Sequence, residues 1–275
     1  MSLAVSMNSS IVRLFGWPVT LLYGDPCILD RWRWLRRHLQ RGSLRTLDAG
    51  CGSGVFTLYA GTLGNEAIGL SFEKENNEKA RTRAKALDLC NVHFMHTDLR
   101  KLDGIAAELG TFDQIICCEV IEHIVDDRKL LASLAAMLKP GGRIVLTTPS
   151  EKHRRLVGER ISESEDGGHV RWGYSRRELR NLLENCGLRT VSEEEISGMM
   201  SQQLTNLCHL LGRIGSRYAT LLTLPLRLLQ LVDIPVTRLV RYPFLCIGIV
   251  CTKPLSVEGN SCLREDCGSR QRTDG

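Results

Sequence analysis

The sequence has few aromatic residues and no apolar run long enough to cross a membrane. Phe, Trp and Tyr make up 5% of the 275 residues, and the arginines are dispersed along the chain. Proteins that bind single-stranded nucleic acid stack bases on aromatic side chains beside a basic groove, so this composition counts against a nucleic-acid partner. A membrane-spanning helix needs about 20 consecutive apolar residues. No stretch of this chain reaches that length.

The eleven cysteines include no C-x-x-C pair, although several of them lie in apolar segments. Zinc-thiolate sites and disulfide frameworks use paired cysteines at short, regular spacings, which are absent here. Ser9, Ser10 and Arg13 interrupt the apolar residues near the N-terminus, a pattern that is not typical of a secretory signal. The cysteine pattern therefore predicts reduced thiols in a cytoplasmic protein.

The composition is that of a globular protein with a mild positive charge. Hydrophobic residues make up 43% of the chain, which suits one full-sized α/β domain with an elaboration. Lys and Arg exceed Asp and Glu by 36 − 31 = 5. An excess of this size is compatible with an anionic membrane surface, and it is also the ordinary charge of a solvated face.

A glycine-rich stretch, Leu47 to Gly54, reads L-D-A-G-C-G-S-G. A short apolar segment typical of a buried strand precedes it, and Val55–Leu63 follows with apolar residues at helical spacing. Glycines in a strand-to-helix turn let a ligand lie against backbone N–H groups. The spacing is not the G-x-G-x-x-G of dinucleotide sites, and no Gly-Lys-Ser/Thr is present to hold a triphosphate. Asp48 would repel a phosphate, so the pattern favours a cationic ligand.

This stretch resembles the first motif of the class I S-adenosylmethionine-dependent methyltransferases. The resemblance implies that Asp48, Gly50, Cys51, Gly52 and Gly54 lie against the amino-acid part of the cofactor S-adenosylmethionine. It further implies contacts with the adenine from two other residues, which are Asp98 and Cys118.

The resemblance is imperfect at the end of the second strand, where most class I members have an acidic residue that accepts hydrogen bonds from both ribose hydroxyls. This chain has Ser71 there, and a serine bonds a ribose less strongly than a carboxylate does. The cyclopropane-fatty-acid synthase branch also has a hydroxyl residue at this point. Ser71 is therefore the expected ribose contact, with Glu73 or Glu75 as compensating groups.

Strand and helix patterns alternate from residue 43 onward, which predicts an α/β fold with a doubly wound sheet and helices on both faces. The resemblance implies seven strands, mostly parallel, in a Rossmann-like order with the last antiparallel. We expect strands at Ser43–Asp48, Ala67–Phe72, Val92–His96, Phe112–Cys118, Arg143–Thr148, Leu188–Ile196 and Phe244–Thr252, with a turn at Lys139–Gly142.

The chain divides into five expected parts. They are an N-terminal helical cap over residues 1–40, the cofactor-binding core over 41–197, an apolar and basic helical insertion over 198–243, the last core strand over 244–252 and a disordered tail over 253–275. In the family an N-terminal segment often covers the cofactor, so Tyr23 or Arg31 is a candidate to reach the methionine carboxylate.

The segment Glu119-x-x-Glu122-His123 carries the candidate chemistry. If a helix begins near Glu119, these side chains share one face and suit Mg²⁺, Mn²⁺ or Zn²⁺ as ligands. The segment is similar to the E-x-x-E-H of the quinol O-methyltransferases and of the small-RNA 2′-O-methyltransferases, where it binds a divalent metal. A Gly-Thr-His segment of the quinol enzymes corresponds to His169 here. Three roles remain open for His123: metal ligand, general base or structural residue.

The insertion is rich in leucine and arginine, and Pro225 and Pro235 are expected to divide it into two or three short helices. Such a segment is typical of an interfacial helix or lid for a lipid, and equally of a packing cap or dimer surface. It is the candidate for membrane-surface contact, which would place the protein at the inner face of a membrane.

These observations predict a methyltransferase that acts on a small or lipid-like acceptor, at oxygen, with His123, Glu122 and His169 as catalytic residues. A carbon methyltransferase acting on a lipid chain is the next hypothesis, and RNA methylation follows it. A membrane-associated module that binds the cofactor without turnover is the non-enzymatic alternative. The sequence leaves the acceptor and the oligomeric state open.

Overall fold

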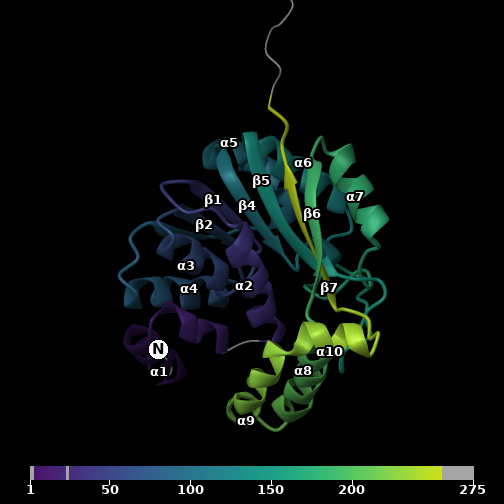
Figure 1. Cartoon of the computed structure of the whole chain (residues 1–275). Helices are drawn as coiled ribbons and strands as arrows, with labels where there is room; N and C mark the ends of the chain where they lie inside the picture. Colours follow the sequence, from purple (N-terminus) through teal and green to yellow (C-terminus); the bar gives the residue numbers. More distant parts are fainter. Residues whose placement is uncertain (1–2, 23–24, 256–275) are drawn as a thin grey trace, which may run out of the picture.

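The computed structural model describes residues 3–22 and 25–255, so Tyr23 and most of the tail predicted for 253–275 lie outside the described residues. Seven strands form one sheet in the order β3-β2-β1-β4-β5-β7-β6 (Figure 1). β7 pairs antiparallel with both β5 and β6, whereas the other pairs are parallel. The predicted mostly parallel sheet with an antiparallel last strand is confirmed. The strands are β1 Arg45–Ala49, β2 Glu66–Ser71, β3 Val92–His96, β4 Phe112–Cys118, β5 Leu138–Pro149, β6 Arg189–Ile196 and β7 Cys246–Thr252.

Helices cover both faces of the sheet (Figure 1). The α-helices of the described chain are α1 Leu3–Phe15, α2 Cys27–His38, α3 Val55–Thr62, α4 Lys74–Ala86, α5 Ala106–Leu109, α6 Asp127–Met137, α7 Arg176–Asn185, α8 Met199–Gly212, α9 Ser216–Thr223 and α10 Asp233–Leu239. Short 3₁₀ helices are η1 Trp17–Leu22, η2 Leu99–Gly104, η3 Ile121–His123 and η4 Pro225–Leu231.

The central strands are apolar on both faces because each face is covered by helices. Successive side chains of a strand point to opposite faces. In β4, Ile115 therefore belongs to the core under α6 and α7, and Ile116 belongs to the core under α2, α3 and α4. Both side chains are fully buried. The continuous apolar run at 115–118 is thus the mark of a strand in the middle of the sheet.

β5 is longer than the sequence predicts. The turn expected at Lys139–Gly142 is part of the strand, which begins at Leu138. The pairing of β5 with β4 shifts register between Phe112 and Gln114, and this shift accommodates the extra residues of β5. Gly141 has φ +78° there, and its N–H donates to the carbonyl of Lys253. The chain past β7 therefore supplies the hydrogen-bond partner that holds this glycine-containing segment at the edge of β5.

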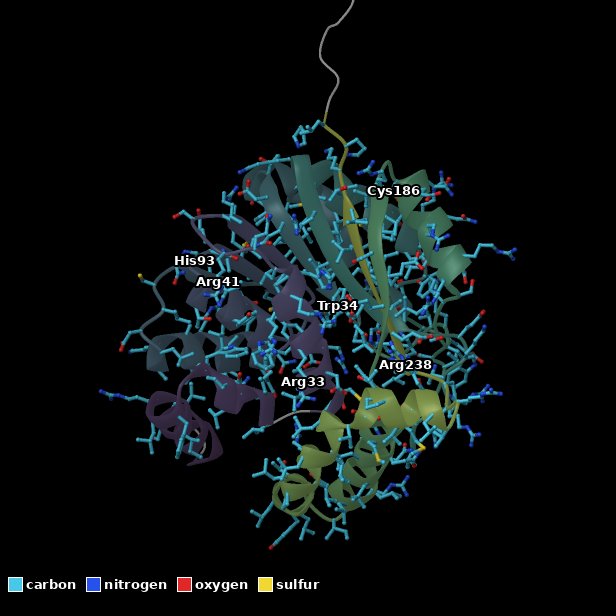
Figure 2. All side chains as sticks on the ribbon, in the orientation of Figure 1. Arg33, Trp34, Arg41, His93, Cys186 and Arg238 are labelled. Atoms are coloured by element: carbon cyan, nitrogen blue, oxygen red, sulfur yellow. The ribbon has the colours of Figure 1, made fainter. Side chains whose placement is uncertain are left out.

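The N-terminal helix α2 packs on the sheet through Trp34, which is 2% exposed and is labelled in Figure 2. A Cβ on Gly248 of β7 would lie 2.7 Å from Cε2 of Trp34. The indole thus needs a residue without a side chain beneath it, because interiors are packed to high density. This close approach fixes α2 near Thr147 of β5 and Glu194 of β6, the two residues that pair with Gly248.

The insertion between β6 and β7 forms four short helical segments, α8, α9, η4 and α10, rather than two or three. They gather at the carboxyl ends of the parallel strands, next to α2 (Figure 1). Asp233 of α10 accepts hydrogen bonds from the N–H groups of Gly198 and Met200, each at 2.8 Å. Nη1 of Arg33 donates to the carbonyl of Gln230 at 3.1 Å, and Figure 2 labels Arg33 together with Arg238 of α10 in this region.

Candidate active site

A cavity of about 240 Å³ opens at the carboxyl ends of β1, β2 and β4. This edge is where open α/β sheets bind ligands. The lining residues come from the glycine turn, the end of β2, the loop after β3, the segment after β4 and the loop that precedes α7. They are Gly50, Gly52, Ser71, Phe72, Glu73, Asn76, Asp98, Leu99, Arg100, Glu119, Val120, His123, Ile124, Glu165 and Gly167.

The three glycines of the turn have positive φ angles but different surroundings. A Cβ on Gly50 would lie 2.4 Å from Cγ2 of Val120, and one on Gly54 would lie 2.7 Å from Cβ of Ala80. These two glycines allow close packing. A Cβ on Gly52 would meet no described atom within 4 Å, so Gly52 leaves open space at the wall of the cavity.

Asp48 lies beneath the turn and is 1% exposed. One of its carboxylate oxygens accepts a hydrogen bond of 2.6 Å from Oγ1 of Thr57. Burial raises the pKa of Asp48 to about 7, against the opposing effect of the hydrogen bonds from Thr57. Asp48 thus ties the end of β1 to the first turn of α3. Among the described residues, the cavity wall does not include Asp48, and it also lacks Cys51, Gly54 and Cys118.

At the far end of the cavity, Ser71 lies beside Phe72 and Arg100, two residues that the sequence analysis did not single out. Phe72, which follows Ser71, is 57% exposed, and the guanidinium of Arg100 lies 5.7 Å from its ring centroid. Arg100 also donates to both carboxylate oxygens of Asp98, at 2.8 and 2.7 Å. These hydrogen bonds lower the pKa of Asp98. An aromatic residue directly after the polar end of a predicted strand was the available sequence signal for this group.

Glu119 does not begin a helix. Its φ is +54°, a conformation uncommon outside glycine, and the next three-residue turn is the 3₁₀ helix η3. Its Oε1 accepts a hydrogen bond of 2.8 Å from Oγ1 of Thr147, and Sγ of Cys246 donates to its Oε2 at 3.4 Å. The expected sharing of one helical face by the E-x-x-E-H residues is therefore wrong, although Glu119 does line the cavity.

Glu122 is fully buried, with one carboxylate oxygen unpartnered. Its Oε2 accepts a hydrogen bond of 3.1 Å from Oγ1 of Thr148, whereas Oε1 has no hydrogen-bond partner among the described atoms. Burial, together with the negative charge of Glu119, raises the pKa of Glu122 well above its usual range. A buried polar oxygen usually has a bonding partner, and for Oε1 that partner can be a proton or a bound cation.

His123 is oriented by the loop that precedes α7. Its Nδ1 lies 3.1 Å from the carbonyl of Gly168, which can only accept, so Nδ1 carries the proton and Nε2 keeps a lone pair. Nε2 lies 3.8 Å from Oε1 of Glu122. Burial lowers the pKa of His123, which favours the neutral ring. The N–H of Val170 donates to the carbonyl of Glu122 at 2.9 Å and ties the same loop to the site.

His169 completes the cluster. Its ring centroid lies 4.6 Å from that of His123, in a T-shaped arrangement. Glu122, His123 and His169 each offer one ligand atom, and these atoms lie within 4.8 Å of one another. One carboxylate and two imidazoles suit a divalent transition metal. The unpartnered Oε1 of Glu122 fits such an ion, so the structure groups His169, rather than Glu119, with the other two predicted ligands.

Arg31 of α2 brings a positive charge to this side of the cavity. Its side chain is 13% exposed and forms an ion pair with Asp25. Burial alone would lower the pKa of Arg31, but the carboxylates of Glu119 and Asp25 hold it above its usual range. Arg31 is therefore a fixed cation close to the cavity residue Glu119.

The glycine turn, the strand-end cavity and the two half-buried imidazoles agree with what sequence comparison finds. The family described as "Methyltransferase domain" matches residues 29–193. The chain belongs to this family. It is a class I S-adenosylmethionine-dependent methyltransferase, and the sheet order described above is that of the family fold.

Two of the similar proteins are named as O-methyltransferases of ubiquinone biosynthesis. The ubiquinone biosynthesis O-methyltransferase of Xanthomonas axonopodis pv. citri is 28% identical over 196 residues, which cover 68% of this chain and 79% of that protein. The mitochondrial ubiquinone biosynthesis O-methyltransferase of Homo sapiens is 28% identical over 184 residues, covering 64% of this chain and 49% of that protein. Among solved structures, a putative sarcosine dimethylglycine methyltransferase from Galdieria sulphuraria has a TM-score of 0.56 at 17% identity, covering 84% and 90% of the two chains.

Proposed function

We propose that the methyltransferase transfers a methyl group from S-adenosylmethionine to a hydroxyl oxygen of a small, lipid-like phenol or quinol. The observation that carries this proposal is the Glu122–His123–His169 cluster, with His123 at the wall of the cavity. The names of the relatives from Xanthomonas axonopodis and Homo sapiens support oxygen as the acceptor atom.

The reaction needs a deprotonated acceptor in line with the methyl group. A phenol has a pKa of about 10 and is mostly protonated at neutral pH. In the proposed step, the acceptor oxygen attacks the methyl carbon, the carbon–sulfur bond breaks, and S-adenosylhomocysteine leaves. Nε2 of His123 is a suitable acceptor for the phenol proton because its ring is neutral and Nδ1 is already held by Gly168.

Glu122, His123 and His169 would also hold a divalent metal ion, since their donor atoms and the unpartnered Oε1 of Glu122 fit one. When bound, such an ion supplies a Lewis acid that lowers the pKa of a coordinated hydroxyl group. The general-base role and the metal role of His123 exclude one another at Nε2. Calorimetry with Mn²⁺ after chelation therefore separates them.

The cofactor is proposed to span the cavity from the glycine turn to Phe72. Gly52 would lie against its methionine part, and Ser71 would bond the ribose. The exposed ring of Phe72 is the surface on which the adenine would stack. Arg31 is the proposed partner of the methionine carboxylate, since it is a fixed cation close to the cavity.

The direct test is a transfer assay with S-adenosylmethionine labelled in its methyl group. We expect label to appear on the oxygen of a prenylated catechol and not on that of its dimethyl ether. Label on carbon would favour the lipid-chain alternative. Cofactor binding without label transfer to any phenol, catechol or lipid would contradict the enzyme proposal and favour the non-catalytic module.

We further propose that the insertion brings the methyltransferase to an anionic membrane surface, where a lipid-like acceptor resides. The described helices include none long and apolar enough to cross a membrane. The insertion nevertheless exposes many large apolar side chains, among them Leu221 at 70%, Leu228 at 71% and Leu239 at 84%. Arg238 and Arg241 belong to the end of the same insertion, and within 3–22 and 25–255 neither forms an ion pair, although Arg238 lines a pocket that also contains Glu195 and Asp233. Apolar burial and attraction to anionic lipids add in such contacts.

Changing Leu228 and Leu239 together to glutamate is expected to weaken binding to phosphatidylglycerol vesicles by at least ~100-fold, because each leucine loses about 1.5–3 kcal/mol of apolar burial. Vesicle flotation measures this effect. Val191→Glu is the matched control, since Val191 is 57% exposed on β6, outside the insertion. Equal flotation of the double variant and the parent protein would leave the insertion as a packing cap.

A further inference from the structure

A buried carboxylate outside the proposed ligand set lies between two imidazoles. Glu159 belongs to the loop between β5 and α7, and its side chain is 9% exposed. Both of its carboxylate oxygens lie 3.1 Å from Nε2 of His153. Its Oε1 also lies 3.5 Å from Nδ1 of His169. Neither Glu159 nor His153 is part of the cavity wall or of the proposed ligand set.

His153 and Glu159 hold one another in a fixed position. Nδ1 of His153 lies 2.6 Å from the carbonyl of Ser150, and Nε2 faces only the carboxylate oxygens of Glu159. A carbonyl and a carboxylate both accept, so both ring nitrogens of His153 carry protons and the ring is cationic. The N–H of Leu156 donates to Oε2 of Glu159 at 2.8 Å. The carboxylate is thus anchored on one side, and His169 lies on the other.

His169 has a buried nitrogen, Nδ1, that faces the carboxylate of Glu159. Nδ1 of His169 has no hydrogen bond of ordinary geometry within the described chain, although it faces Oε1 of Glu159. Hydrogen bonds of catalytic groups are often long without ligands and tighten when the ligand binds. The backbone of His169 is held separately, because its carbonyl accepts a hydrogen bond from the N–H of Ser162 at 2.7 Å.

We propose that Glu159, braced by His153, is a positioning residue that keeps the proton of His169 on Nδ1 and leaves the lone pair of Nε2 for the site. Histidines that bind metals typically donate their second N–H to a carboxylate, which fixes both the tautomer and the ring orientation. Because the cation of His153 balances the anion of Glu159, this orientation is gained without adding net charge beside Glu122. The proposal rests on the proposed role of His169 in the active site.

The first test reads the tautomer directly and requires neither a metal nor turnover. Nitrogen-15 NMR of the histidine rings at pH 7.5 is expected to show His169 protonated on Nδ1 in the parent protein. In Glu159→Gln, the His169 ring is expected to shift toward the Nε2–H form. Glu163→Gln is the control, because Glu163 is an exposed residue of the same loop. A parent His169 protonated on Nε2, or a spectrum unchanged in Glu159→Gln, would overturn the proposal.

The second test measures Mn²⁺ affinity by calorimetry. Loss of an outer carboxylate typically weakens metal binding by about 10–100-fold, and we expect this for Glu159→Gln but not for Glu163→Gln. If Glu159→Gln does not fold, His153→Gln replaces it; that change keeps an N–H donor for Glu159 but removes the cation, and a partial shift of the His169 tautomer is expected. A parent protein that binds no Mn²⁺ would refute the metal role alone, since the tautomer measurement still decides the role of Glu159.

Discussion

His123→Ala is expected to lower kcat for methyl transfer by about 10²–10⁴-fold, the usual contribution of a positioned acid–base group. The imidazole is the one group of the cluster that lies at the cavity wall with a free lone pair on Nε2. The affinity for S-adenosylhomocysteine should stay within about threefold, since a loss confined to the transition state lowers kcat without weakening cofactor binding. Turnover with labelled cofactor, together with calorimetry, measures both quantities.

A matched control is His93→Ala, because His93 is an exposed residue of β3 that lies outside the cavity. It is expected to keep parental turnover. If His123→Ala turned over as fast as His93→Ala, His123 would be a structural residue of the loop. If His123→Ala lost cofactor affinity as well as turnover, the substitution would have disrupted the structure of the site.

Gly52→Val is expected to abolish detectable binding of S-adenosylmethionine, a loss of at least ~100-fold, because each unfavourable 1.4 kcal/mol costs a factor of ten. The added side chain would occupy the open space at the cavity wall, where a Cβ meets nothing within 4 Å. It also introduces a branched residue at φ +50°. Isothermal calorimetry with S-adenosylmethionine and S-adenosylhomocysteine measures the effect.

Gly187→Val separates the effect of filling the cavity from the effect of backbone strain. Gly187 has φ +75° and also has open space around its missing Cβ, but it follows α7 and lies away from the cavity. Both variants are expected to lose stability from backbone strain, which thermal unfolding measures. Only Gly52→Val should lose the cofactor. Unchanged affinity in a folded Gly52→Val would contradict the placement of the cofactor against the glycine turn.

The sheet could be predicted from the sequence because its signals are local. The apolar run at 115–118 reports burial on both faces, and the turn with Gly50, Gly52 and Gly54 reports positive φ angles. β5 was predicted too short, because its extension depends on pairing with the chain after β7, to which Gly141 donates. Local patterns carry no information about such a distant partner.

The candidate site was less predictable than the sheet. Helical spacing placed Glu119, Glu122 and His123 on one face, but the left-handed backbone of Glu119 breaks that periodicity. Resemblance pointed to His169, whereas nothing in the sequence marked Glu159. The loop that contains both has no regular period. Hydrogen bonds between distant residues bring its members together: Gly168 and Val170 bond the segment after β4, and Ser162 bonds His169.

Two hydrogen bonds link this loop to Glu122 and His123, the residues of the candidate site that follow β4. The carbonyl of Gly168 orients the ring of His123, and the N–H of Val170 holds the backbone of Glu122. The position of the His123 ring is therefore set by a residue 45 positions away in the sequence. A substitution that shifts this loop is expected to change the orientation of the imidazole even when the segment after β4 is left unaltered.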